Sequence, residues 1–197
     1  MQKLILSSSN PGKLRELRSA LAPFVAEMLT QDELGIGETE EPHNTFVENA
    51  LAKARHASRA SGLPALADDS GICVVALGGA PGVLSARYAG EPTSDARNNE
   101  KLLQVMKGVA DRRAYYYCTL VLVRHADDPQ PLIAEGEWHG EVARQTLGEG
   151  GFGYDPLFWL PQLNKMSAEL SYDTKAALSH RAQALQGLLQ KLRTAQY

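Results

Sequence analysis

The stretch Ala65-Leu66-Ala67-Asp68-Asp69-Ser70-Gly71-Ile72-Cys73-Val74 decides the fold expected for this chain of 197 residues. Its first three residues are typical of a short buried strand, which the apolar run from Ile72 to Leu77 continues. The small and acidic residues between the two runs favour a turn. The sequence therefore predicts two carboxylates, Asp68 and Asp69, at the end of a buried strand.

Two adjacent carboxylates suit magnesium, a hard cation that prefers oxygen ligands. The alternative is an Asx-type turn, in which Asp68 and Asp69 only hydrogen-bond nearby backbone groups. Glu40 and Glu41 form a second acidic group ahead of Pro42. These two glutamates could supply a further magnesium ligand or a polar group that holds a metal-bound water. The alternative is that they interact only with the dipole of the helix that follows.

The N-terminal strand Leu4–Leu6 leads into a turn of small residues, Ser7 to Lys13, and then into a helix. Asn10 is the expected N-cap, and Pro11 occupies the first helical position. Three leucines at helical spacing follow: Leu14, Leu17 and Leu21. Backbone N–H groups of this turn, together with Lys13, could bind a phosphate. An ordinary connection between strand and helix is the alternative.

A second helix is predicted to begin near Thr45, because Thr45 and Glu48 have capping-box spacing ahead of an alanine-rich run. Asn49, Lys53 and His56 share one polar face of this helix. Further along, Ser94 to Lys107 predicts a helix. The remaining predicted elements are a hairpin of Tyr115–Val123 and Leu132–Trp138, a strand Leu157–Leu160 and a final amphipathic helix with Leu185, Leu188, Leu189 and Leu192 inward.

Two later segments are candidate binding sites. The glycine-rich loop from Gly148 to Pro156 could wrap a ligand, with Phe152 as a stacking face, or could be a plain connection. Ser179-His180-Arg181, preceded by Lys175, opens the final helix and could bind an anion or a carbonyl-rich partner. A capped helix with solvated charges is the alternative.

Bulk composition narrows the class of protein. A net charge of −3 excludes the overall basic surface expected of a protein that grips a nucleic-acid polymer. The two cysteines lie in apolar runs, so a disulfide framework is not expected. No apolar run is long enough for a membrane span or a signal peptide, so a cytoplasmic location is expected. Residues 1–197 are predicted to form a single domain.

Taken together, the motifs resemble the inosine triphosphate pyrophosphatase family, whose members act on non-canonical purine nucleoside triphosphates. The resemblance covers nearly the whole chain and is strongest to the bacterial dITP/XTP pyrophosphatases. It rests on Ser7–Lys13, Glu48–Ala50 with Lys53, Ala67–Gly71, Gly78–Gly82, Ser85–Tyr88, Gly150–Pro156 and Ser179–Arg181. The chain departs at Ser8-Ser9, where many relatives carry Thr-Gly, so the phosphate contacts of these serines are less secure than those of Lys13.

The resemblance implies roles for individual residues. Asp69 is the expected general base and a magnesium ligand, with Glu41, or Glu40, as a second acid at the metal and Asp68 beside it. The implied triphosphate-binding residues are Ser8, Ser9, Asn10, Pro11, Gly12, Lys13 and Lys53. The implied nucleoside-binding residues are Ser70, Phe152, Gly153, Tyr154, Asp155, Lys175, His180 and Arg181.

The resemblance also implies an elongated mixed α/β sheet flanked by helices, a central substrate cleft, magnesium as cofactor and a homodimer. The implied reaction is hydrolysis of ITP, dITP or XTP at the α-phosphorus. The alternative is a nucleotide-binding module without turnover, against which the pair of aspartates argues. Crowding by Asp68 would raise the pKa of Asp69 and magnesium would lower it, so local chemistry does not choose between Asp68 and Asp69 as the proton acceptor.

Overall fold

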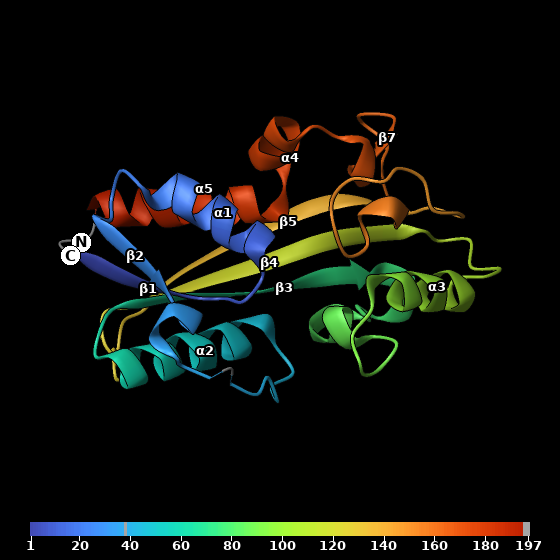
Figure 1. Ribbon diagram of the computed structural model, residues 1–197. Helices are drawn as coiled ribbons and strands as arrows, with labels where there is room; N and C mark the ends of the chain where they lie inside the picture. The colour runs from blue at the N-terminus through green and yellow to red at the C-terminus, as the bar shows by residue number, and fades with distance from the viewer. Residues whose placement is uncertain (38, 195–197) are drawn as a thin grey trace. The chain divides into compact units, whose positions relative to one another are not determined.

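The strands of the computed structural model, which describes residues 1–37 and 39–194, belong to one sheet (Figure 1). Within these residues the sheet has seven strands in the order β2-β1-β3-β4-β5-β6-β7. The strands are β1 Lys3–Ser7, β2 Glu27–Thr30, β3 Ala65–Val74, β4 Arg113–Val123, β5 Leu132–Val142, β6 Phe158–Leu160 and β7 Lys165–Met166. β1 is parallel to β2 and β3, whereas β6 is antiparallel to β5 and β7. The predicted mixed α/β fold is confirmed.

The helices begin where the sequence provides caps. They are α1 Pro11–Leu21, α2 Phe46–Ser61, α3 Asp95–Val105, α4 Tyr172–Leu178 and α5 His180–Thr194. Side chains of Asn10, Thr45 and Ser94 accept hydrogen bonds from the first turns of α1, α2 and α3. Such caps satisfy N–H groups that have no partner inside the helix. The three predicted helix starts are therefore confirmed.

The chain forms two compact units. The first comprises Met1–Asp69, Cys118–Gly136 and the segment that begins at Gln183, and the second comprises Ser70–Tyr117 and Glu137–Ala182. β3, β4 and β5 each contribute residues to both units. The single domain expected over residues 1–197 stays a prediction.

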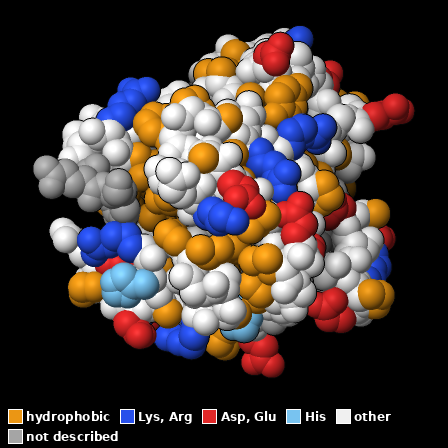
Figure 2. Space-filling view, turned by 60° about the vertical axis from the view of Figure 1, so that its left-hand side comes forward, with side chains coloured by type: hydrophobic (Ala, Val, Ile, Leu, Met, Phe, Trp, Pro, Cys, Tyr) orange, Lys and Arg blue, Asp and Glu red, His pale blue; other side chains and the backbone are white. Residues whose placement is uncertain are grey.

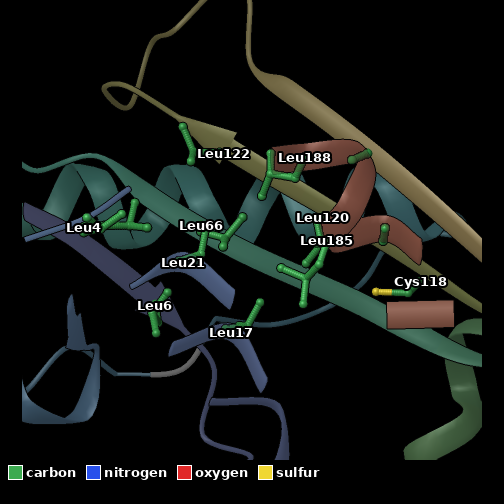
Figure 3. Packing of buried hydrophobic residues seen from close by; sticks show 13 residues of the cluster. Leu4, Leu6, Leu17, Leu21, Leu66, Cys118, Leu120, Leu122, Leu185 and Leu188 are labelled. Atoms are coloured by element: carbon green, nitrogen blue, oxygen red, sulfur yellow. The ribbon is translucent and has the colours of Figure 1, made fainter. Parts of the chain in front are cut away.

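In the first unit, alternate side chains of the strands pack against different helices. One set packs with leucines of α1 and α5 (Figure 3). Its strand members are Leu4, Leu6, Leu66, Leu120 and Leu122. The other set packs with Ala50, Ala54 and Ala57 of α2 and comprises Ile5, Ala65, Ala67, Val121 and Val123. Because a strand has a side-chain period of two, α1 and α5 cover one face and α2 covers the other.

The parallel pairing of β1 with β3 places the end of β1 beside the two aspartates of β3. Ser7, the last residue of β1, lies opposite Ala67. The chain that leaves β1 for α1 therefore starts beside Asp68. Ligands bind beyond the carboxyl ends of strands in open α/β sheets, and the carboxyl end of β1 lies beside the middle of β3.

The turn predicted at Asp68-Asp69-Ser70-Gly71 is wrong, and so is its Asx-turn alternative, because Ala65–Val74 is one continuous strand. Packing overrides the low strand preference of these residues. A Cβ atom on Gly71 would lie 2.4 Å from the Ser85 Oγ atom, so only glycine allows this close approach. The next residue, Ile72, donates its N–H to the same Oγ atom at 3.0 Å.

Smaller differences occur at other elements. β2 was not predicted, because four residues give too short a pattern to recognise. Val75–Leu77 and Asp155–Leu157 are 3-10 turns, so the strands predicted to Leu77 and from Leu157 are shorter. The short helix α4, which carries Lys175, was also missed, whereas α5 begins at His180 as predicted.

The second unit has its own core, which includes Ile72 and Val74 of β3, Leu102 and Met106 of α3, and Leu157 and Phe158. Leu102 and Met106 are fully buried, as predicted for the inward face of α3. β4 and β5 are neighbours in the sheet, as the predicted hairpin requires. Both cysteines are buried, and neither forms a disulfide within the described residues. Among the described residues, no helix is long and apolar enough to cross a membrane.

Candidate active site

Asp68 and Asp69 lie next to each other in the sequence but on opposite faces of β3, because side chains alternate along a strand. Asp68 lies on the face that α1 covers and forms an ion pair with Lys13, Nζ to Oδ2, at 2.8 Å. Asp69 lies on the face that α2 covers. The two carboxylates therefore contact different helices.

Helix α2 supplies the polar partners of Asp69. The Asn49 Nδ2 group donates a hydrogen bond to Asp69 Oδ2 at 3.1 Å, and the Lys53 ammonium lies 3.8 Å from Asp69 Oδ1. Lys53 also forms an ion pair with Glu41. Asn49 and Lys53 are four residues apart, so the shared polar face predicted for this helix places both at the same carboxylate.

Burial and charge set the protonation of this cluster of Lys13, Glu41, Lys53, Asp68 and Asp69. The side chain of Asp69 is 7% exposed, and its burial, with the nearby carboxylate of Glu41, raises its pKa to about 6 against the opposing effect of Lys53. Glu41 is thus one carboxylate that raises the pKa of Asp69. Burial alone would lower the pKa of Lys53, yet Asp68, Asp69 and Glu41 together raise it.

The oxygen atoms of Glu41 and Asp69 fit magnesium. The cluster carries three carboxylates against two ammonium groups, and the mutual repulsion of Glu41 and Asp69 is visible in the raised pKa of Asp69. Within residues 1–37 and 39–194, no group of three or more Cys, His, Asp and Glu side chains is placed to hold a metal ion. That result is compatible with magnesium, which takes one or two carboxylates and completes its shell with water and phosphate. Glu40 is exposed, so the structure favours Glu41 as the second acid.

The turn before α1 presents a capped helix end. Asn10 Oδ1 accepts hydrogen bonds from the N–H groups of Gly12 and Lys13, at 2.9 Å and 3.1 Å. Ser8 Oγ accepts the N–H of Asn10 at 3.3 Å, and Pro11 has no N–H to offer. The N–H groups expected to bind phosphate are therefore already used by Asn10, and Lys13 is the main cationic group of this turn.

In the second unit, Asp155 is the centre of a buried hydrogen-bond network. The residue is 1% exposed. Its Oδ1 atom accepts hydrogen bonds from Ser167 at 2.9 Å and Tyr116 at 3.4 Å. Its Oδ2 atom accepts the N–H of Phe152 at 2.9 Å and an ion pair from Lys175. Asp155 thereby joins the glycine-rich loop, α4, β4 and the 3-10 turn Ser167–Glu169.

Phe152 and Lys175 come together at this network. The Phe152 ring is 38% exposed, and the Lys175 ammonium lies 4.8 Å from its centroid, within cation–π distance. Tyr154, by contrast, is buried, and its hydroxyl donates to the Ser85 carbonyl at 2.8 Å. Its side chain belongs to the core, so only its backbone can take the predicted binding role.

The third group of polar residues consists of the buried His180 and Arg181 and the partly buried Ser70. The Arg181 Nη2 atom donates to Ser70 Oγ at 3.1 Å. The His180 ring stacks on Tyr116, with centroids 4.8 Å apart and planes inclined by 10°. Tyr116 reaches Asp155 in turn, so His180 is linked to the Asp155 network through one aromatic ring.

Sequence reasoning missed three residues of these sites. Asn49 was placed on the polar face of α2 but not assigned to Asp69. Tyr116 was read only as a strand residue, although alternation in the run Tyr115–Tyr117 could have marked it as the inward member. Ser167 carries no sequence signal, because its contact with Asp155 depends on tertiary folding.

Charged side chains of both signs alternate with apolar ones on the face shown in Figure 2. A nucleic-acid polymer would require a continuous basic surface, and the expectation that no such polymer is bound stays a prediction.

Comparison with known proteins gives close relatives over nearly the whole chain. The dITP/XTP pyrophosphatase of Ralstonia nicotianae is 64% identical over 196 residues, covering 98% of each chain. That of Nitrosomonas europaea is 61% identical over 192 residues, covering 98% of this chain and 95% of the relative. The solved structure of a HAM1 protein from Coxiella burnetii has a TM-score of 0.94 at 44% identity, covering 99% of this chain and 100% of that one. The Staphylococcus aureus Ham1 protein has a TM-score of 0.89 at 37% identity, covering 98% and 99%.

The model of the Ham1 family matches residues 4–191, which include every candidate site residue described above. On this match and on the identities to its relatives, the chain belongs to the Ham1 family.

Proposed function

We propose that this protein hydrolyses ITP, dITP and XTP at the α-phosphorus and releases the nucleoside monophosphate and pyrophosphate. Its relatives at about 60% identity are dITP/XTP pyrophosphatases, which supports this substrate class. The observation that carries the proposal is the buried carboxylate of Asp69, with a pKa raised to about 6. A general base works best when its pKa lies near the working pH.

Asp69 accepts the proton of the attacking water in this proposal. The hydrogen bond from Asn49 to Oδ2 fixes the orientation of the carboxylate and leaves Oδ1 on the side of Lys53. Deprotonated Asp69 predominates above pH 6, so the base is in its active form at neutral pH. The adjacent Asp68 forms an ion pair with Lys13, which supports Asp69 as the proton acceptor in this proposal.

Lys13 and Lys53 bind the triphosphate. Phosphoryl transfer depends mainly on positioning and on neutralising oxygen charge, which two partly buried ammonium groups provide. Their ion pairs with Asp68 and Glu41 hold the ammonium groups in place before substrate arrives. Ser8, Ser9, Asn10, Pro11 and Gly12 surround the same phosphates in this proposal.

Glu41 and Asp69 would hold magnesium, with Asp68 nearby. When bound, magnesium supplies positive charge to the phosphate oxygens. The ion would also reduce the repulsion between the two carboxylates and lower the pKa of Asp69.

The purine lies on Phe152 in this proposal, and Lys175, His180 and Arg181 supply donors to its 6-oxo group. An amino group at the same position would meet these donors unfavourably, which disfavours adenine. The other residues proposed at this end are Ser70, Gly153, Tyr154 and Asp155. A substrate cleft, a homodimer and a cytoplasmic location complete the proposal, since they follow from family resemblance and from the short apolar runs.

The decisive experiment incubates the protein with ITP and magnesium and identifies the products by ion-exchange chromatography. We expect IMP and pyrophosphate in equal amounts, with activity abolished by a chelator. Release of orthophosphate and IDP would contradict attack at the α-phosphorus, and tight binding of ITP without turnover would favour a binding module. Asp127→Asn, at an exposed residue paired with Arg59, is the matched control.

A further inference from the structure

Helix α3 holds both polar backbone groups of Gly153. The N–H of Gly153 donates to Asp95 Oδ2 at 2.6 Å, and its carbonyl accepts from Asn99 Nδ2 at 2.8 Å. Asp95 and Asn99 are four residues apart, so they lie on one face of α3. All of these residues belong to the second unit.

Asn99 is 7% exposed, and its Oδ1 atom is buried without a hydrogen-bond partner among the described residues. A half-satisfied buried amide destabilises a protein, so packing alone does not account for asparagine here. The one hydrogen bond that the structure gives its amide holds Gly153.

Phe152 lies between two anchors. Its own N–H donates to Asp155, and the next residue, Gly153, is held by Asp95 and Asn99. Gly153 has φ +63°. Glycine adopts this conformation without strain, but it adopts many others as well, so glycine alone does not hold the loop in place. The two anchors therefore fix the backbone from which the exposed Phe152 ring projects.

Helix α3 is itself held in place by packing and by its N-cap. Leu102 and Met106 are fully buried, and Ser94 caps the first turn. The neighbouring Asn98 makes different contacts: it accepts the N–H of Ala89 at 2.7 Å and donates to the Ala86 carbonyl at 2.9 Å. Asn98 thus resembles Asn99 in type and burial but does not contact the glycine-rich loop.

We propose that Asp95 and Asn99 are positioning residues that fix the Phe152 ring for stacking on the base of the substrate. This inference rests on the proposed function only for the identity of the ligand. A loop ordered in advance loses less conformational entropy on binding, so affinity for the base rises without any direct contact from α3.

The first test measures amide hydrogen exchange of residues 150–154 in the free protein. Asp95→Ala and Asn99→Asp each remove one bond to Gly153, and we expect exchange to be faster by about tenfold. Asp95→Asn retains an acceptor oxygen and is expected to restore most of the protection. Unchanged exchange in both Asp95→Ala and Asn99→Asp would overturn the proposal.

The second test separates the base from the phosphates. In Asp95→Ala and Asn99→Asp, we expect the KM for ITP to rise by about tenfold with kcat within about threefold. Inhibition by inorganic tripolyphosphate, which has no base, should be unchanged. Equal weakening of ITP and tripolyphosphate would overturn the proposal, because a general structural defect affects both.

Asn98→Ala and Glu100→Gln are the controls on the same helix, since neither residue bonds to Gly153. Both should keep the wild-type KM for ITP and the wild-type exchange of residues 150–154. Absence of ITP turnover in the wild-type protein would count against the proposed function, whereas the exchange measurement tests the anchoring of Gly153 by itself.

Discussion

Asp69 and Asp128 are both buried aspartates of the first unit, 5% and 0% exposed, yet their pKa values shift in opposite directions. Asp128, between β4 and β5, accepts hydrogen bonds from the backbone N–H and Nε of Arg124, each at 2.9 Å, and from the N–H of Gln130 at 2.9 Å. The Arg124 guanidinium holds its pKa well below the usual range. At Asp69, burial and Glu41 outweigh Lys53 and Asn49 and raise the pKa.

The difference teaches that burial alone does not decide the charge of a carboxylate. Several N–H donors aimed at Asp128 replace the water it loses, so its charge stabilises the fold. Asp69 faces a cation that it shares with Glu41, so its charge is left partly uncompensated and available for chemistry. Removing the Asp69 carboxylate should therefore impair catalysis, whereas removing the Asp128 carboxylate should reduce stability.

The largest expected effect is on catalysis. Asp69→Asn removes the proposed base while keeping the size of the side chain, and we expect kcat for ITP to fall by about 100-fold to 10,000-fold. Asp128→Asn should keep kcat within about threefold. Pyrophosphate release at pH 8 measures both, and activity of Asp69→Asn near the wild-type value would remove Asp69 from the base role.

The next effect concerns stability and pH in the metal-free protein. Because the pKa of Asp69 is raised from 3.8 to about 6, protonated Asp69 stabilises the fold below pH 3.8, and this contribution is lost as the pH rises through 6. At about 1.4 kcal/mol for each pH unit, the loss is on the order of 3 kcal/mol. Urea unfolding in the presence of a chelator would give the free energy of unfolding of the wild type and of Asp69→Asn. We expect the difference, wild type minus variant, to decrease over this pH window. A difference that is flat between pH 4 and 7 would show that the pKa of Asp69 is not raised.

Asp128→Asn should destabilise the protein by about 1–3 kcal/mol at pH 7, because charge-assisted hydrogen bonds to Arg124 are weakened. The linked pH dependence has the opposite sign to that of Asp69. The lowered pKa of Asp128 gives stability that is present above the unfolded value near 4 and is lost as the pH falls below it. Scanning calorimetry of wild type and variant would measure the loss, and equal unfolding temperatures would contradict it.

The smallest expected effect is that of Glu41→Gln on the titration of Asp69. Removing the Glu41 charge takes away one cause of the raised pKa of Asp69. Lys53 also loses its ion pair with Glu41 and can interact more strongly with Asp69, so the pKa of Asp69 should fall. Carboxyl carbon NMR of the metal-free protein would follow this titration, with Asp128 as the internal reference. An unchanged Asp69 titration would mean that burial alone raises the pKa.

Much of the fold follows from local sequence. Asn10, Thr45 and Ser94 each satisfy the first turn of their own helix, and a contact over two or three residues can be read directly from the chain. The leucines of α1 and α5 and the alanines of α2 likewise show their buried faces through helical spacing. Family resemblance then named the residues of the candidate site.

The arrangement within the site depends on distant residues. Asn49 meets Asp69 across 20 positions, Tyr116 meets Asp155 across 39, and Asn99 meets Gly153 across 54. No periodicity links positions so far apart, so these contacts could not be predicted. The strand through Asp68 and Asp69 was missed for the same reason, because the close approach of Ser85 to Gly71 is a tertiary contact.

The sequence by itself determined the family, the helix starts, the mixed α/β class and the acidic, basic and aromatic residues available for chemistry. Only the tertiary structure decided that Asp68 and Asp69 face opposite sides of β3, that Glu41 shares Lys53 with Asp69, and that α3 holds the loop of Phe152. The physical reason is range: capping and periodicity act within a few residues, whereas desolvation and charge pairing depend on what the fold brings into contact.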